Sequence, residues 1–244
     1  MNFLAGQTLI FDKPYGITSF ALVGKVRWLL THRMGGRKIK VGHAGTLDPL
    51  ATGLMVICTG RATRQIDRLQ AGVKEYEAMI QLGATTPSFD LEHPIDAIYP
   101  TEHITRERIE QILPQFLGEI MQVPPAFSAC KVKGKRAYDL ARKGEEVLLK
   151  PKPLHIDEME ILDFQPDACS LSLRIVCSKG TYIRALARDI GKALDSGAHL
   201  TQLRRTRVGD FRVEDGFTLE TFEQWLQTIE VETELDAPAH EPIP

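Results

Sequence analysis

The glycine-rich stretch GHAGTLDPLATGL, at residues 42–54, sets one histidine and one aspartate among small and apolar residues. Asp48 stands directly before Pro49, and this pair is a favourable N-cap and first position for one helical turn closed by Gly53. A cap holds a carboxylate rigidly, so a capping role and a chemical role for Asp48 are compatible. His43 by itself is more typical of a loop histidine than of a ligand or a base.

A complementary cation stands far along the chain, within KGTYIRALARDIG. If Thr181 caps a helix here, Arg184 lies in the first turn, where a cation opposes the helix dipole by a few tenths to about 1 kcal/mol. Arg184 would be better placed facing a carboxylate or a phosphate, although a solvent-exposed arginine is the simpler interpretation. Tyr76 and Tyr182 are most simply core aromatics, but inward tyrosines beside a loop can also stack on a base.

The common cofactor and metal motifs are absent from the chain. It contains no phosphate-binding G-x-x-x-x-G-K-[ST], dinucleotide-binding G-x-G-x-x-G, zincin H-E-x-x-H or hydrolase G-x-S-x-G. The zinc deaminase signature is also missing. We therefore expect chemistry from scattered side chains, with no metal and no nucleotide cofactor.

The cysteines and the apolar segments indicate a cytoplasmic protein. The cysteines have no C-x-x-C spacing and are interpreted as reduced, with those at 58 and 177 in apolar surroundings expected to be buried. No apolar run approaches the roughly 18 residues of a membrane span. The N-terminus, MNFLAGQTLIFDKP, has neither the basic start nor the long apolar core of a signal peptide.

The formal net charge of −2 conceals a basic body and an acidic C-terminal segment. Residues 214–244 hold nine acids and no Lys or Arg, which leaves a net charge of +7 on residues 1–213. Bases cluster at 25–40, 131–152 and 204–212. A basic body suits a polyanion such as RNA, although a solvated basic surface is the alternative.

Hydrophobic periodicity predicts the elements that must position these residues. Strands are expected at 7–12, 53–60, 74–84 and 170–183, the last overlapping the start of a helix, and helices at 19–30, 61–69, 105–117, 181–194 and 218–229. Alternation over 74–84 turns Tyr76 inward, Ser19 is the expected cap of the first helix, and Pro114 weakens the second half of 105–117. The segment that starts at Gln122 should begin as a loop and continue as a short basic helix that ends near Gly144. Because strands and helices do not alternate strictly, the fold class is α+β.

Six ordered motifs together resemble one family. They are LIFDKPYGITS, GHAGTLDPLATGLMVICTGRATR, KEYEAMIQLG, QVPPAFSACKVKGKRAYDLARKGEEV, VCSKGTYIRALARDIG and LTQLRRTRVGDF. Their order and spacing, from about residue 7 to residue 225, resemble those of the TruB-type tRNA pseudouridine-55 synthases. The resemblance implies the α+β pseudouridine synthase fold, a long and mostly antiparallel mixed sheet flanked by helices, with a catalytic cleft.

The resemblance also implies an activity, the isomerisation of uridine 55 in the T arm of tRNA. The glycosidic C–N bond breaks, the uracil turns over, and a C–C bond forms, without a cofactor. The target nucleotide must flip out of its stack, at a cost of a few kcal/mol. Asp48 matches the catalytic aspartate, and three roles stay open for it: attack on the sugar, attack on the base, or removal of a ribose proton.

The same resemblance assigns roles to the other candidate residues. Arg184 matches the arginine that pairs with the catalytic carboxylate, and Tyr76 matches the tyrosine that stacks on the flipped uracil. His43 is similar to the histidine that takes the vacated stacking position. Tyr182 and Leu203 resemble further pocket residues. The lysine of the N-terminal motif corresponds to Lys13, for which we expect a structural or RNA-facing role.

For domains, the resemblance implies a catalytic domain over 1–230, an RNA-clamping thumb at about 124–152, and an acidic tail at 231–244. The bases expected to meet the RNA backbone are Lys131, Lys133, Lys135, Arg136, Arg204 and Arg205. The chain departs from the family pattern in two respects. No PUA domain is recognisable, and TTPSFDLEHPI stands where the family usually has T-D-T-x-D-x-x-G. The second departure leaves the conformation of this loop open. The expected partner is the T-arm stem-loop of tRNA, with no membrane, bound by a monomer.

Other functions remain open from the residues alone. A non-catalytic tRNA-binding or folding chaperone could use the same basic surface without needing Asp48, Tyr76 and Arg184. A structural protein with a basic face predicts no salt-sensitive binding of RNA. A synthase with broader RNA targets or a guide-RNA partner is a related enzyme, although the missing PUA domain argues against guide dependence.

Overall fold

The structure is a computed structural model that describes residues 1–128, 130–132, 135–143 and 147–232. The expected acidic tail beyond residue 232 lies outside the described residues. Contacts within the chain divide it into two compact units. Unit 1 comprises Met1–Gly72 and Thr206–Pro244, and unit 2 comprises Val73–Arg205.

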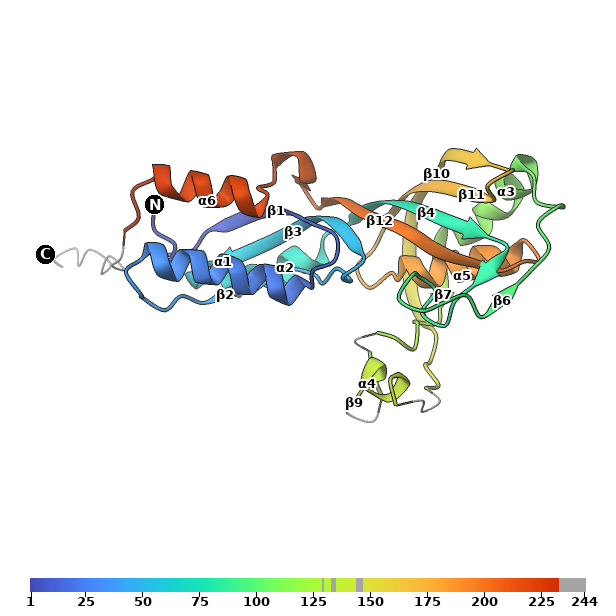
Figure 1. The fold of residues 1–244 in the computed structure, drawn as a ribbon, viewed down its shortest axis with the longest axis horizontal. Coiled ribbons are helices and arrows are strands. Elements are labelled where there is room, and N and C mark those ends of the chain that lie inside the picture. The colour runs from blue at the N-terminus through green and yellow to red at the C-terminus, as the bar shows by residue number, and fades with distance from the viewer. Residues whose placement is uncertain (129, 133–134, 144–146, 233–244) are drawn as a thin grey trace, which may run out of the picture. The chain divides into compact units, whose positions relative to one another are not determined.

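Unit 1 is built on three antiparallel strands (Figure 1). They are β1 (Thr8–Lys13), β2 (Val41–His43) and β3 (Ala51–Thr59). Strand β3 pairs with β1 along one edge and with β2 along the other. All but one of its nine residues are buried, which confirms the strand predicted from its continuous apolar run.

Helix α1 (Ser19–Arg33) and helix α6 (Leu219–Thr228) complete the core of unit 1. Helix α1 begins at Ser19 and continues three residues beyond the expected end at Leu30, and the Thr18 side chain, not that of Ser19, accepts the amide of Ala21. The predicted Ser19 cap is therefore wrong. Helix α6 packs through an aromatic cluster made of Phe3, Phe11, Phe217, Phe222 and Trp225.

The segment after β3 was predicted as one helix and forms two shorter ones. A 3₁₀ helix, η1 (Gly60–Gln65), precedes α2 (Ile66–Ala71). Farther along the chain, unit 1 also contains β13 (Phe211–Arg212) and the 3₁₀ helix η3 (Val213–Asp215). Strand β12 (Ala198–Val208) crosses the boundary between the units in sequence.

Unit 2 contains four antiparallel strands in the order β4, β11, β10, β7. These are β4 (Lys74–Leu82), β11 (Ser170–Cys177), β10 (Lys152–Gln165) and β7 (Gly118–Gln122). Burial alternates along β4 as predicted, and Tyr76 lies on its buried face, opposite Ile175 of β11. The antiparallel pairing and the separate helices confirm the α+β class.

Helix α5 (Ile183–Ala193) packs against β4 in unit 2. Tyr182 is its N-cap and makes no side-chain cap bond, whereas Thr181 donates to the Ser178 carbonyl, so the predicted Thr181 cap is wrong. Pro114 interrupts the predicted 105–117 helix, which becomes α3 (Arg106–Ile112) and the 3₁₀ helix η2 (Leu113–Phe116). The remaining elements are β5 (Ala84–Thr85), β6 (Ala97–Ile98), β8 (Lys131–Val132), β9 (Lys135–Arg136) and α4 (Ala137–Ala141).

All four cysteines are free, and three of them, including Cys58 and Cys177, are buried. This agrees with the predicted reduced thiols, although Cys169 is only half-buried. Among the described residues, no helix is long and apolar enough to cross a membrane.

Candidate active site

Asp48 lies in a tight turn that leads into β3, and not at a helix N-terminus. The Ala51 amide donates to the Asp48 carbonyl oxygen over 3.1 Å, and β3 begins at Ala51 itself. The predicted helical turn is therefore wrong, because the chain enters strand β3 at Ala51, directly after Leu50. Asp at the first and Pro at the second position are also favourable in a β-turn, so the same two residues serve this structure.

A buried lysine holds the turn from the Pro49 side. The ammonium group of Lys13, at the end of β1, donates to the carbonyl oxygens of Pro14 and Ile17 over 2.9 Å each and to that of Pro49 over 3.3 Å. The Gly16 amide also donates to the Pro49 carbonyl, over 2.9 Å. Lys13 is fully buried. These contacts give Lys13 a structural role beside Asp48.

A buried serine holds the turn from the other side. The Ser19 Oγ lies 2.8 Å from both the carbonyl oxygen and the amide nitrogen of Leu47, donating to the first and accepting from the second. Its side chain thus serves as a backbone partner for the residue directly before Asp48. This explains why Ser19 is buried and not available as a helix cap. Sequence reasoning missed this role, because the two residues are 28 positions apart.

His43 and Lys13 end the two strands that pair with β3 in unit 1. His43 ends β2 and lies opposite Ile57, while Lys13 ends β1 and lies opposite Gly53. His43 and Asp48 are both half-buried. Unit 1 therefore contains three of the predicted site residues: Lys13, His43 and Asp48.

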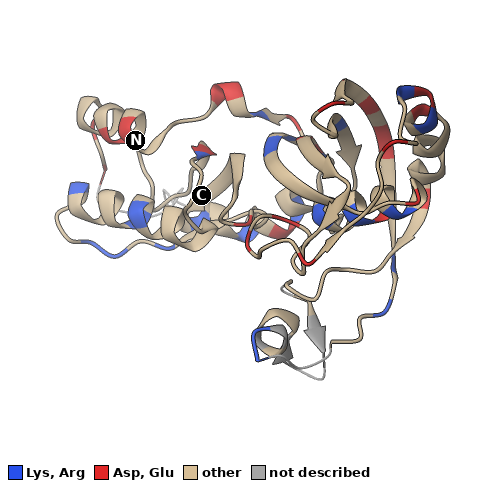
Figure 2. Ribbon diagram, turned by 45° about the vertical axis from the view of Figure 1, so that its right-hand side comes forward, with Lys and Arg blue, Asp and Glu red and all other residues tan. Residues whose placement is uncertain are grey.

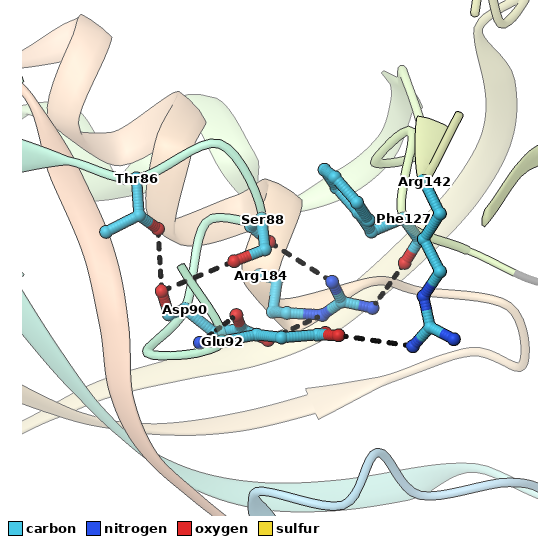
Figure 3. A network of polar contacts seen from close by, with 7 residues as sticks. All are labelled: Thr86, Ser88, Asp90, Glu92, Phe127, Arg142 and Arg184. Atoms are coloured by element: carbon cyan, nitrogen blue, oxygen red, sulfur yellow. Dashed lines mark hydrogen bonds and ion pairs between the residues drawn. The ribbon is translucent and has the colours of Figure 1, made fainter. Parts of the chain in front are cut away.

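Arg184 occupies the first turn of α5, as predicted, and is buried in unit 2. Its guanidinium donates to the carbonyl oxygens of Ser88, over 3.1 Å, and Phe127, over 2.9 Å. Its Nε also lies 3.5 Å from a carboxylate oxygen of Asp90 (Figure 3). The anion that the first-turn argument required is present in the form of Asp90. The predicted pairing of Arg184 with Asp48 would link the two units and stays a prediction.

The loop that departs from the family pattern folds around Asp90 (Figure 3). The Thr86 hydroxyl donates to the Asp90 carbonyl oxygen over 2.6 Å, and the Glu92 amide donates to the Asp90 carboxylate over 3.0 Å. Phe89 has a left-handed backbone with φ of 61°, which is costly for a bulky residue. Sequence reasoning missed Asp90, although an acid within TTPSFDLE was the available signal.

Tyr182 lies against a thiol and a lysine. Its hydroxyl is 3.3 Å from the Cys130 sulfur, and Lys152 donates to the same sulfur over 3.7 Å. Burial, followed by the interaction with Cys130, raises the pKa of Tyr182 to about 12. Burial alone would raise the pKa of Cys130, but hydrogen bonds from Tyr182 and Ser128 and the charge of Lys152 outweigh it and lower that pKa. Tyr182 therefore acts as a neutral donor at this position.

The other predicted pocket residues lie on the strands of unit 2. Tyr76 is buried on β4, and Leu203 is half-buried on β12. Lys74 precedes Tyr76 on the same buried face, and burial, with Arg205 nearby, lowers the pKa of Lys74 to about 8. Unit 2 therefore contributes Tyr76, Tyr182, Arg184 and Leu203.

The predicted RNA-backbone residues fall into three groups. Lys131, Lys135 and Arg136 lie on the paired strands β8 and β9, whereas Lys133 is outside the described residues. Arg204 is half-buried on β12, so its predicted phosphate contact stays a prediction. Arg205 is only 1% exposed, and this burial does not support a contact with an RNA phosphate.

Comparison with known families adds an independent line of evidence. Residues 32–183 match the TruB family pseudouridylate synthase (N terminal domain). Residues 184–238 match the tRNA pseudouridylate synthase B C-terminal domain. Together the two matches include Asp48, Tyr76, Asp90 and Arg184.

Individual proteins resemble the chain over nearly its whole length. The tRNA pseudouridine synthase B of Phocaeicola vulgatus is 63% identical over 235 residues, which cover 95% of this chain and 98% of that protein. The protein of the same name from Bacteroides thetaiotaomicron is 62% identical over 238 residues, covering 97% and 99%. In the crystal structure of a Cbf5–Nop10–Gar1 complex, one chain matches with a TM-score of 0.68 and 29% identity, covering 91% of this chain and 55% of that chain.

Proposed function

Since the chain belongs to the TruB family of pseudouridylate synthases, we propose that it converts uridine 55 in the T arm of tRNA into pseudouridine, with Asp48 as the catalytic residue. At the level of the family, the chain is a tRNA pseudouridine synthase. The predicted pseudouridine synthase fold is confirmed by the likeness to Cbf5. The position in the tRNA and the role of Asp48 are the proposed part.

The reaction is an isomerisation, so its atoms balance without a co-reactant. The bond from the ribose C1′ to N1 of uracil breaks, the base turns, and C1′ bonds to C5. The proton of C5 is lost, and N1 gains a proton. A carboxylate serves this chemistry as a nucleophile, or as a base that takes a proton. Either role requires a carboxylate held in a fixed place.

The observation that carries the proposal is the rigid turn around Asp48. Buried Lys13 and Ser19 fix the backbone on its two sides, at Pro49 and Leu47. Such fixing by buried partners is how a reactive group is held in productive geometry.

Residues of unit 2 support the handling of the base. A flipped uracil needs an aromatic partner, and Tyr76 would provide one from the buried face of β4. The guanidinium of Arg184 is fixed by Asp90 and two carbonyl oxygens, so it is oriented before any substrate binds. A fixed cation in a buried environment stabilises negative charge strongly, and this suits a partner for the Asp48 carboxylate.

Tritium release tests the activity. The wild-type protein and the Asp48→Asn and Asp48→Ala variants are incubated with tRNA labelled at C5 of uridine, and product position is mapped on the same tRNA. We expect release from wild type and from the control variant below, and none from the two Asp48 variants, while both Asp48 variants still bind a T-arm stem-loop. Asp67→Asn, which changes an exposed acid on α2, is the matched control. Product from either Asp48 variant contradicts the catalytic role, and binding without release by wild type favours a tRNA chaperone.

A further inference from the structure

The outer face of α1 exposes an aromatic strip that its packing does not explain. Phe20 is 75% exposed and Trp28 is 55% exposed. The His32 ring stacks on Trp28, with centroids 5.6 Å apart and planes 6° from parallel. Residues four apart lie on one helix face, so Phe20, Trp28 and His32 form a single strip. A surface helix normally places polar residues on this face.

Gly24 lies at the centre of the same strip. A Cβ built at this position meets nothing within 4 Å, so packing in this structure does not require a glycine. Glycine inside a helix is less favourable than alanine. At 1.5 Å per residue, Phe20 and Trp28 are separated by about 12 Å along the axis, with Gly24 midway. The strip therefore consists of two aromatic side chains with a stretch of uncovered helix backbone between them. A flat ligand can approach the backbone closely at Gly24.

The charge around the strip indicates which ligand fits. The Lys25 ammonium lies 4.5 Å from the centroid of the Trp28 ring. Residues 25–40 carry six Lys and Arg and no acid, and the exposed Arg37, Lys38 and Lys40 continue the positive charge into the loop after α1 (Figure 2). Alternating aromatic and basic groups suit unpaired nucleotides, whose bases stack while their phosphates meet the cations. An apolar protein partner would not need this charge.

Other bases of this region have structural contacts. Arg27 donates to the Val41 carbonyl over 3.1 Å. Arg33 donates to the carbonyl oxygens of Leu226 and Ile229, which joins α1 to α6. The outward cations and aromatics are therefore separate from the side chains that hold the helix in unit 1.

We propose that the outer face of α1, formed by Phe20, Gly24, Lys25, Trp28 and His32, is a stacking platform for an unpaired segment of RNA. The inference rests on the proposed RNA substrate and adds a second RNA contact to it. Phe20 and Trp28 hold bases by stacking, Gly24 admits the base between them, and Lys25 with the following loop meets the phosphates.

Direct binding tests the platform without depending on catalysis. The chain has two tryptophans, and Trp225 is packed in the aromatic cluster of unit 1. In a Trp225→Phe background, Trp28 is the only reporter, and an eight-nucleotide single-stranded oligouridylate should quench its fluorescence. Anisotropy of a labelled copy of the same RNA should show about tenfold weaker binding for Trp28→Ala, because stacking on an aromatic side chain is worth about one to three kcal/mol per base. A duplex RNA of equal phosphate number is the control for charge.

Gly24→Ala makes the test independent of folding defects. The added methyl group should raise the melting temperature and yet weaken oligouridylate binding, because it fills the space above the helix backbone. Equal binding by wild type, Trp28→Ala and Gly24→Ala overturns the platform. Equal binding of single-stranded and duplex RNA also overturns it, since this shows charge alone. Because these assays need no pseudouridine, their failure is distinguishable from failure of the proposed activity.

Discussion

Asp90 and Arg184 form a buried ion pair, with 3.5 Å between the carboxylate oxygen and Nε and side-chain exposures of 8% and 6%. The pair connects a loop after β4 with the first turn of α5, 94 residues later in the chain, and so fixes the cation that the proposed chemistry uses. Charges buried at this level are costly unless they are paired and hydrogen-bonded.

Replacing Asp90 with Asn should therefore weaken both the fold and the activity. The variant leaves the Arg184 guanidinium buried with neutral partners, so we expect a loss of unfolding free energy on the order of 3 kcal/mol. Urea unfolding measures this loss, and tritium release measures the activity. Glu92→Gln is the control from the same loop, because Glu92 pairs with Arg142 at 3.4 Å with both side chains exposed. Glu92→Gln should lower the unfolding free energy by less than about 1 kcal/mol. Equal losses for the two variants would contradict the importance of the buried pair.

Ser19→Ala should loosen the turn at Asp48 with little effect elsewhere. The variant removes two hydrogen bonds to Leu47 and leaves a buried carbonyl without its donor, at a cost of about 1–3 kcal/mol. We expect kcat to fall while affinity for a T-arm stem-loop is kept, because the change reaches Asp48 through the backbone. Ser19→Thr keeps the hydroxyl and should restore most of the rate. An unchanged kcat for Ser19→Ala would show that Asp48 does not depend on this support.

Lys13→Met tests whether the buried lysine serves structure or RNA binding. Three carbonyl oxygens lose the ammonium donor, although that of Pro49 keeps the Gly16 amide, so we expect a loss of about 3 kcal/mol in unfolding free energy. The salt dependence of RNA binding should stay the same, because a fully buried ammonium group meets no phosphate. Lys38→Met, at an exposed position, should leave the unfolding free energy nearly unchanged and reduce the salt dependence of RNA binding. If Lys13→Met instead reduces the salt dependence of RNA binding, Lys13 faces the RNA and the structural interpretation is contradicted.

Lys74 should make stability depend on pH. Burial, with Arg205 and Lys179 nearby, lowers its pKa from 10.5 to about 8. Between these values the unfolded chain binds more protons than the folded chain, so unfolding free energy rises with pH across this window, by up to about 3 kcal/mol. Burial also raises the pKa of Cys177 to about 11, and this opposes the rise above pH 9. Urea unfolding from pH 7.5 to 10.5 should show the rise in wild type and not in Lys74→Met. If the unfolding free energy depends on pH in the same way in wild type and in Lys74→Met, the lowered pKa of Lys74 is contradicted.

The local sequence was sufficient for strands β1, β3, β4 and β11 and for most helices, whereas strands β7, β10 and β12 were not predicted. The continuous apolar run of β3 and the alternation along β4 each report burial directly, because side chains on a strand alternate in period two. Pro114 marked the end of α3, since proline removes a backbone donor. The order of the motifs also indicated the family, because six spaced motifs restrict the number of matching families far more than any single pattern does.

Only the tertiary structure decided how the candidate residues are held. Ser19 and Asp48 both looked like helix caps, because a cap and a β-turn favour the same short polar side chains. In the fold, the Asp48 segment forms a β-turn that enters β3 at Ala51, and Ser19 has a partner in Leu47. The position of Arg184 in a first helical turn indicated that it needs an anionic partner. Only the fold shows that this partner is Asp90, which lies in a loop far away in the sequence. Long-range contacts of this kind depend on how strands pair and helices pack, so local spacing predicts the need for a partner and not its identity.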